Sequence, residues 1–435
     1  MKLRYRILQS RYSSDAPWQN WGFFYEKVHN GAGAICHHNL DELHWVVHEI
    51  NRCTRGQPLS LDRVDEAVAE HADHYRVLPE IHEYDQDSEP LSASINQIEA
   101  CVLGLTCDES HDSSADEICI FSGRANRPLA HAVAHQLGFP LSAISITPLP
   151  DSEVHVQINE AVRRKDVFLI QPCTAPVNDH LVELLLMVDA CRRASAGSIT
   201  AIIPYFPYAR QERMSKGREA ISARAVASML EQMGIDRVIY VDIHAEATQG
   251  FFTVPVDRLQ AFPILSDYFR GKPFLEDAVI VSPDVGRTRL ASKYAQTLGV
   301  PLVVMQKRRD GGKVKTTHVV GDVKGKVPIV IDDIIASGSV LGQLPLLLEK
   351  GARPEVHLAI THPVLLPRAM KRMNADWLAE LVVSDTVLVP PAKHHPKLQV
   401  VSVAPMLAYA IRGIHYGTSI SPLWEPDAPR KLGFC

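Results

Sequence analysis

Residues 327–340 are VPIVIDDIIASGSV, and this stretch decides the fold. An apolar run ends in two adjacent carboxylates, Asp332 and Asp333, and a small-residue turn (ASGS, 336–339) follows at once. A buried strand, a polar turn and a helix expected to begin near Val340 are typical of one repeat of an α/β sheet. Backbone N–H groups at such a turn suit phosphate, and carboxylates accept hydrogen bonds from sugar hydroxyls. The stretch therefore predicts a site for a phosphorylated sugar, with a plain serine-capped turn as the alternative.

The alternation of short apolar strands and helix-like segments runs from residue 118 to near residue 424. Such alternation predicts parallel sheets with helices on both faces, and ligands gather at the carboxyl ends of their strands. We expect two tandem α/β domains, at 117–258 and 259–424, followed by a tail at 425–435. The predicted strands are ICIFSG (118–123), ISITPL (144–149), DVFLIQP (166–172), ITAIIPY (199–205), RVIYVDIHA (237–245), AVIVSPD (278–284), PLVVMQK (301–307), VPIVIDD (327–333), VHLAITH (356–362) and ELVVSD (380–385).

Residues 1–116 form an acidic N-terminal extension. They carry a net charge of −11 and the remainder carries +6, which together give the −5 of the whole chain. A mildly basic remainder suits anionic substrates, and the small overall charge gives no general reason to expect nucleic-acid or membrane binding. Apolar spacing predicts helices over 41–52 and 61–75, whereas the acidic stretches 82–90 and 107–117 predict a surface loop and a linker. We expect α or α+β structure in the extension and assign it no activity.

The eight cysteines are scattered and include no CxxC pair. The first ten residues, MKLRYRILQS, lack the apolar stretch of a signal peptide, and the chain has no apolar run of the roughly 18 residues that span a membrane. A cytoplasmic protein with reduced thiols is therefore expected. Cys36, His37, His38 and Cys53 match no standard zinc spacing, so ordinary structural residues are favoured over metal ligation there.

A series of long motifs between residues 117 and 424 resembles the ribose-phosphate pyrophosphokinase (PRPP synthetase) family. VIDDIIASGS (330–339) is similar to the phosphoribosyl-binding motif of the phosphoribosyltransferase superfamily to which that family belongs. The other motifs follow in the order that the family has. They are SGRANRPLA (122–130), PVNDHLVELLLMVDACRRASA (176–196), IPYFPYARQERMSKGREAISA (203–223), RVIYVDIHAEATQGFF (237–252), IVSPDVG (280–286), KRRDGGKV (307–314), GDVKGK (321–326) and VSVAPMLAYAIRGIH (401–415).

The resemblance implies an enzyme with two phosphoribosyltransferase-like domains. It would transfer the β,γ-diphosphate of Mg-ATP to the 1-hydroxyl of ribose 5-phosphate, giving PRPP and AMP, with Mg²⁺ as cofactor. It would also form a homo-oligomer, either a dimer or a hexamer. Lys307 and Arg309 match a mobile catalytic loop of the family, where two cations suit the negative charge on the transferred group.

The resemblance also assigns residues that bind the substrates and the metal. For ATP these are Arg210 and Gln211, together with Asp151 and Glu153, which in the family often act across a subunit boundary. His244 and Asp284 would hold Mg²⁺, and His244 would also contact ATP. Direct binding of His244 to phosphate oxygens stays open, because histidine is an unusual ligand for this hard cation. For ribose 5-phosphate the implied residues are Asp332 and Asp333 at the sugar hydroxyls, and Ala336, Ser337, Gly338, Ser339 and Val340 at the phosphate.

Several positions depart from the family pattern. Leu149 replaces an aromatic residue that would stack on adenine, and Arg287 stands where a second glycine is usual. Arg287 either clashes with the ligands or adds a cation near the pyrophosphate. In the phosphate turn, Ala336 replaces an aspartate and Ser339 a glycine, while Val340 lacks the hydroxyl of the usual threonine. The loss of that hydroxyl predicts one phosphate hydrogen bond fewer.

These departures leave two other hypotheses open. The chain could be a catalytically weak regulatory subunit that binds nucleotide and assembles with active subunits. It could also be a phosphoribosyltransferase that consumes PRPP, although that activity does not explain the YARQER and DIHA segments. An active synthetase is favoured because Lys307 and Arg309, which a regulatory subunit does not need, are both present.

Overall fold

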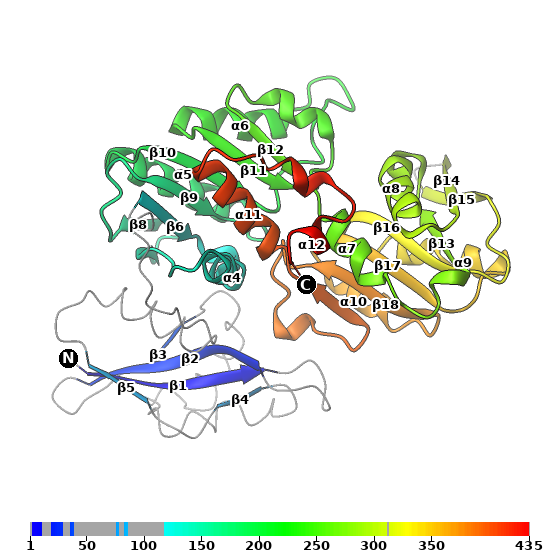
Figure 1. The fold of residues 1–435 in the computed structure, drawn as a ribbon, viewed down its shortest axis with the longest axis horizontal. Helices are drawn as coiled ribbons and strands as arrows, with labels where there is room; N and C mark the ends of the chain where they lie inside the picture. Colours follow the sequence, from blue (N-terminus) through cyan, green and yellow to red (C-terminus); the bar gives the residue numbers. More distant parts are fainter. Residues whose placement is uncertain are drawn as a thin grey trace.

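The computed structural model describes residues 117–310 and 313–434, and within the first 116 residues the backbone of five strands (Figure 1). The side chains of residues 307–317 are not among the described parts. No described helix is long and apolar enough to cross a membrane.

The first domain contains a five-stranded parallel sheet in the order β12-β11-β10-β9-β6. Its central strands are almost wholly buried and mostly apolar, because helices cover both faces of the sheet. An antiparallel hairpin of β7 and β8 stands apart from this sheet. The strands are β6 (Ile118–Ser122), β7 (Ile144–Pro148), β8 (Val154–Ile158), β9 (Asp166–Ile170), β10 (Ser198–Ile203), β11 (Arg237–Val241) and β12 (Val256–Leu259), and the helices are α4 (Arg127–Leu137), α5 (Val177–Arg193) and α6 (Ser222–Met233).

The second domain contains a seven-stranded sheet in the order β15-β14-β13-β16-β17-β18-β19. All neighbouring pairs are parallel except β14 and β15, which form a hairpin. The chain runs outward from β13 to β15 and then returns to place β16 beside β13. A crevice at such a reversal is the usual ligand site of an open α/β sheet. The strands are β13 (Ala278–Ser282), β14 (Leu302–Asp310), β15 (Lys313–Val320), β16 (Val327–Ile335), β17 (Val356–Pro363), β18 (Leu378–Ser384) and β19 (Leu398–Val401), and the helices are α7 (Phe262–Phe269), α8 (Thr288–Leu298), α9 (Pro345–Glu349) and α10 (Pro367–Met373).

The C-terminal segment crosses back to the first domain. Helix α11 (Ala404–His415) packs against α4, as the orange-red helix beside the teal one in Figure 1 shows. Nδ1 of His415 lies 2.7 Å from Oδ2 of Asp166, at the start of β9. Helix α12 (Ala428–Lys431) instead packs against α7. The domain bounds stay a prediction, and in space residues 404–415 lie with the first domain.

The described part of the N-terminal extension is an antiparallel sheet built around β1 and β2. Its strands are β1 (Lys2–Ser10), β2 (Gln19–Val28), β3 (Ile35–His38), β4 (Tyr75–Val77) and β5 (His82–Asp85). The predicted loop at 82–90 is wrong over its first four residues, which form β5 because their backbone pairs with β1. The predicted helices at 41–52 and 61–75 lie outside the described residues, except that Tyr75 is in β4. Cys53 and the linker before residue 117 also lie outside them.

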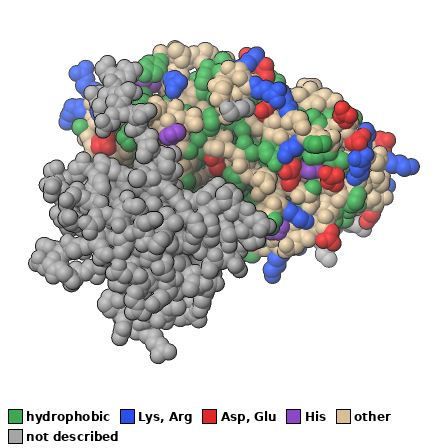
Figure 2. Space-filling model, turned by 60° about the horizontal axis from the view of Figure 1, so that its bottom comes forward, with side chains coloured by type: hydrophobic (Ala, Val, Ile, Leu, Met, Phe, Trp, Pro, Cys, Tyr) green, Lys and Arg blue, Asp and Glu red, His purple; other side chains and the backbone are tan. Residues whose placement is uncertain are grey.

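Every strand predicted between residues 118 and 385 is confirmed. On the face shown in Figure 2, basic and acidic side chains of the described residues are interspersed. That face lacks the single-sign stripe that is typical of a nucleic-acid-binding surface.

Candidate active site

The acidic pair lies within β16, at the reversal of the second sheet. Asp333 is 4% exposed, and its backbone N–H donates to Oδ1 of Asp332 at 2.9 Å. Nδ1 of His244 lies 2.8 Å from Oδ2 of Asp333. Because His244 follows β11, this contact joins the end of a first-domain strand to the carboxylates of the second domain. Two of the predicted motifs, DIHA and IDD, therefore meet at one place.

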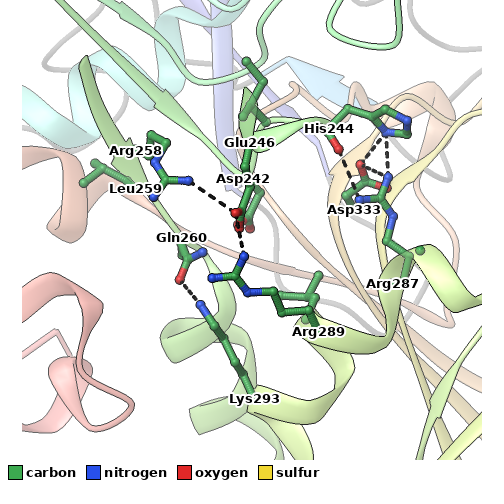
Figure 3. Close-up of a pocket in the computed structure, with 13 residues that line it drawn as sticks. Asp242, His244, Glu246, Arg258, Leu259, Gln260, Arg287, Arg289, Lys293 and Asp333 are labelled. Carbon is green, nitrogen blue, oxygen red and sulfur yellow. Dashed lines mark hydrogen bonds and ion pairs between the residues drawn. The ribbon is translucent and has the colours of Figure 1, made fainter. Parts of the chain in front are cut away.

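Arg287 inserts its guanidinium into the same cluster (Figure 3). Its Nη2 lies 2.7 Å from Oδ2 of Asp333, and its Nε lies 3.4 Å from Oδ1 of Asp332. The same Nη2 is 2.6 Å from Nδ1 of His244, while Nη1 donates to the backbone oxygen of His244 at 3.4 Å. The guanidinium of Arg287 therefore lies at the carboxylates, and both outcomes expected for it, a clash with the ligands or a cation near the pyrophosphate, stay predictions.

The proton on His244 can be assigned from these contacts. Nδ1 cannot both donate to Asp333 and accept from Arg287. Donation to Asp333 is favoured, because it places the N–H against a carboxylate while Arg287 donates to the same oxygen. With Nδ1 facing Asp333, Nε2 is the ring nitrogen that could contact a metal or a phosphate oxygen.

The two carboxylates differ in their ionisation. Burial and the neighbouring Asp333 charge raise the pKa of Asp332 well above its usual range. Burial also acts to raise the pKa of Asp333, but the hydrogen bond from His244 and the charge of Arg287 outweigh it and lower that pKa to about 2. Asp333 is therefore the more acidic member of the pair.

Asp284 lies directly after β13, next to β16. Its side chain caps a short 3₁₀ helix at Val285–Arg287 by accepting from the backbone N–H of Arg287 at 3.2 Å. Arg287 therefore contacts Asp284 through its main-chain N–H. Through its side chain it contacts the two carboxylates and His244.

The phosphate turn follows β16 but does not open a long helix. A 3₁₀ helix at Leu341–Gln343 and the five-residue α9 stand where the sequence predicted a helix near Val340. Gly338 has φ of +68°, and a Cβ there would lie 2.9 Å from Cα of Ala369. Val340 is 5% exposed and packs in the second-domain core. This burial argues against a phosphate contact through the side chain at position 340, and the expected loss of one phosphate hydrogen bond stays a prediction.

Arg210 and Gln211 line a second pocket of about 290 Å³. Tyr205 and Ile334 line it too, and Ile334 follows Asp333 directly. Burial raises the pKa of Tyr205, which also feels the charges of both Arg210 and Asp333. The predicted nucleotide residues therefore adjoin the predicted sugar residues.

Two groups of predicted residues are not among the described residues that line these pockets. Asp151 and Glu153 are exposed in the turn of the β7–β8 hairpin, beside Leu149, which is 38% exposed. Lys307 and Arg309 lie on β14 and pair with Thr316 and Val314 of β15, so their backbone is a hairpin arm. Their side chains, and residues 311–312 between the arms, lie outside the described parts.

Sequence reasoning missed several residues of the inter-domain pocket, whose volume is about 250 Å³. Arg289 donates to Glu246 at 2.8 Å, and Lys293 donates to Gln260 at 2.8 Å. Arg287 was noted only as a departure from the family, and its position directly after SPDVG was the available signal.

Comparisons with known proteins agree with this geometry. A family described as the N-terminal domain of ribose phosphate pyrophosphokinase matches residues 118–234, and one described as a phosphoribosyl synthetase-associated domain matches residues 308–425. A ribose-phosphate pyrophosphokinase of Nostoc sp. is 42% identical over 338 residues, which are 77% of this chain and 100% of that protein. The chain belongs to the ribose-phosphate pyrophosphokinase family.

Other members of the ribose-phosphate pyrophosphokinase family match the same part of the chain. A chloroplastic ribose-phosphate pyrophosphokinase 2 of Oryza sativa subsp. japonica is 43% identical over 317 residues, or 72% of this chain and 79% of that protein. The crystal structure of phosphoribosylpyrophosphate synthetase from Mycobacterium smegmatis has a TM-score of 0.66 at 42% identity and covers 69% of this chain and 99% of its own. The fold class of two phosphoribosyltransferase-like domains is thereby confirmed.

A magnesium site in this ribose-phosphate pyrophosphokinase family member would rest on His244 and Asp284. Among the described residues, no group of three or more His, Cys, Asp or Glu side chains is arranged to hold a metal. Mg²⁺ usually binds to one or two protein ligands and completes its shell with water and substrate phosphates. Nδ1 of His244 bonded to a carboxylate is also typical of a ligating histidine. The donor set therefore fits a magnesium ion that arrives with ATP.

Proposed function

We propose that this chain is a ribose-phosphate pyrophosphokinase, which makes PRPP and AMP from ATP and ribose 5-phosphate. The contact that carries the proposal is the 2.8 Å approach of His244, from the first domain, to Asp333, in the second. It unites the predicted metal or phosphate ligand with the predicted sugar carboxylates. Family membership supports the same activity.

The proposed sugar site combines two kinds of group. Asp332 and Asp333 accept hydrogen bonds from the ribose hydroxyls. The turn of Ser337, Gly338 and Ser339 supplies N–H and hydroxyl donors to the 5-phosphate. Because the helix after the turn is short, its dipole contributes little, and the direct donors carry the phosphate.

The proposed nucleotide site adjoins the sugar. Arg210 and Gln211 contact ATP in the pocket that also contains Ile334. Asp151 and Glu153 are proposed to reach the adenosine of a neighbouring subunit, which makes the active form a homo-oligomer (dimer or hexamer). Their exposure, away from both pockets, supports a role across a subunit boundary.

In the proposed reaction, the 1-hydroxyl oxygen of the sugar bonds to the β-phosphorus of ATP. The bond from that phosphorus to the α,β-bridging oxygen breaks, AMP leaves, and the hydroxyl loses its proton. Mg²⁺ bound at His244 and Asp284 would neutralise phosphate charge. Lys307 and Arg309 are proposed to stabilise the negative charge that develops on the transferred group. Holding both substrates on adjoining pockets supplies orientation.

The remaining proposals concern where the protein works. We propose a cytoplasmic, reducing location, supported by Cys119, Cys173 and Cys191, which are buried and unpaired. ATP and ribose 5-phosphate are the proposed partners, without nucleic acid or membrane.

A regulatory, weakly active subunit is the second candidate. The observation in its favour is the guanidinium of Arg287 at the sugar carboxylates, where the family usually has glycine. The two functions are separated by incubating the purified protein with Mg-ATP and ribose 5-phosphate and measuring AMP and PRPP. We expect both products from the wild-type protein and their loss in Lys307→Ala. Nucleotide binding without AMP formation would reject the synthetase and favour the regulator.

A further inference from the structure

Arg287 contacts each of the four residues that were predicted to hold the metal and the sugar. Its backbone N–H donates to Asp284 at 3.2 Å. Its guanidinium lies 2.7 Å from Asp333 and 2.6 Å from His244 (Figure 3). It also lies 3.4 Å from Asp332. Arg287 therefore joins both halves of the site, alongside the direct contact of His244 with Asp333.

The carboxylates and the guanidinium are largely shielded from water, whereas the side chain of His244 is 32% exposed. The side chains of Asp333, Asp332 and Arg287 are 6%, 16% and 19% exposed. Two adjacent carboxylates at this depth repel one another and need a cation beside them. Removing one partner of such a buried network leaves the other charge uncompensated, which is far more damaging than losing a surface ion pair.

Occupation of the carboxylates by Arg287 leaves room for the sugar. An ionised carboxylate offers about four lone-pair sites, so the pair offers more acceptors than Arg287 and His244 use in the contacts above. The guanidinium is a planar fork that fixes the carboxylates in one orientation. Sugar hydroxyls would then meet acceptors that are already in place.

We infer that Arg287 is a positioning residue for ribose 5-phosphate, which holds Asp332, Asp333 and His244 in the arrangement that binds the sugar. This inference rests on the proposed function of the site. It requires that the guanidinium stays at the carboxylates when the sugar binds. A guanidinium that the sugar displaces would act in the opposite direction, because its removal would strengthen sugar binding.

The test compares Arg287→Ala and Arg287→Lys with wild type. Calorimetric titration with ribose 5-phosphate alone gives the Kd, and PRPP formation gives KM and kcat. We expect Arg287→Ala to raise Kd and KM for ribose 5-phosphate by roughly 10- to 100-fold, the range for a lost charged hydrogen-bond partner, with a smaller change in kcat. Arg287→Lys should recover part of the loss, because it restores the charge without the fork. Methylguanidinium should restore binding to Arg287→Ala at constant ionic strength.

Arg353→Ala is the matched control. It removes an arginine whose Nη2 lies 2.7 Å from Asp277, which precedes the start of β13 and so lies at the other end of that strand from Asp284, and it should leave Kd unchanged. An unchanged or lower Kd in folded Arg287→Ala would overturn the inference. If Arg287→Ala does not fold, a Kd for Arg287→Lys equal to wild type overturns it instead. The absence of PRPP from wild type would reject the proposed function, whereas binding by calorimetry tests Arg287 separately.

Discussion

The hydroxyl of Thr361, on β17, donates to Oδ2 of Asp242 at 2.7 Å and so joins the two domains beside the site. The same oxygen accepts from the backbone N–H of Ala261 at 3.0 Å. Asp242 lies two residues before His244 and adopts a φ of +38°. The contact therefore fixes the segment that carries His244 toward the acidic pair, although neither Thr361 nor Asp242 was predicted as part of the site.

Thr361→Val should destabilise the protein more at pH 8 than at pH 5. Burial raises the pKa of Asp242 to about 6, even though the hydrogen bond from Thr361 acts to lower it. Above pH 6 the carboxylate is charged, and the loss of a donor to it should lower the free energy of unfolding by about 1.5–3 kcal/mol. At pH 5 it is mostly protonated in the folded protein, and the loss should fall to about 1 kcal/mol.

Urea denaturation at the two pH values measures this difference. Thr361→Ser keeps the hydroxyl and is the control, with the expectation that its loss of stability is small and similar at both values. An equal loss for Thr361→Val at pH 5 and pH 8 would show that the hydroxyl does not act on the charge of Asp242.

His362, the next residue, should make the protein sensitive to acid. Its Nε2 lies 3.1 Å from the backbone oxygen of Val241 and its Nδ1 lies 2.8 Å from Oγ1 of Thr386. Burial lowers its pKa to about 4, so the folded state resists its protonation. Neutral His362 makes its full contribution to the free energy of unfolding above pH 6.5. Roughly 3 kcal/mol of that contribution is lost as the pH falls toward 4.

The comparison with His362→Gln isolates this contribution, because Asp242 titrates in the same range with the opposite sign. The advantage of wild type over the variant in free energy of unfolding should shrink as pH is lowered from 7 to 4. A difference between the two proteins that does not change with pH would contradict the assignment.

The strands of both sheets could be predicted from the sequence because they are buried. Strand β13 is covered on both faces, so it appears as an apolar run (AVIV, 278–281) bounded by polar residues. His244 and Asp333 could each be predicted as site residues because each lies near the carboxyl end of a strand in its own sheet, where ligands gather.

Contacts between domains could not be predicted in the same way. The positions of Arg287 and Thr361 depend on how the two sheets face each other, which no local pattern encodes. The direction in which a side chain points from a turn cannot be predicted from a local sequence pattern either. A missing hydroxyl at Val340 is visible in the sequence, but its burial in the core follows only from the path of the chain after Gly338.

Val340→Thr should therefore lower stability without improving the binding of ribose 5-phosphate. Val340 packs in the same core as Leu341 and Leu344, which are 1% and 0% exposed. Burying a hydroxyl there should cost about 1–3 kcal/mol of stability, because valine and threonine have similar shape but differ in polarity. KM for ribose 5-phosphate should stay the same. A lower KM would mean that the hydroxyl reaches the phosphate after all.

Gly338→Ala tests whether the turn after β16 has to lie tight against α10. A methyl group at Gly338 would approach Cα of Ala369 to 2.9 Å, and backbone atoms at that distance must move. Nη1 of Arg372, also on α10, donates to the backbone oxygen of Gly338, so movement of the turn breaks that bond. We expect KM for ribose 5-phosphate to rise by roughly 10-fold or more, as the donors of the turn lose their positions.

Gly417→Ala is the control that separates the backbone conformation from the close approach. Gly417 has φ of +65°, near the +68° of Gly338, but a methyl group there would meet no atom within 4 Å. Gly417→Ala should lower the free energy of unfolding by only about 1–2 kcal/mol, which is the cost of an alanine in the left-handed conformation, and should leave KM unchanged. Gly338→Ala should lose more stability than this. If the two variants lose the same stability and both keep the wild-type KM, the packing of α10 does not position the phosphate turn.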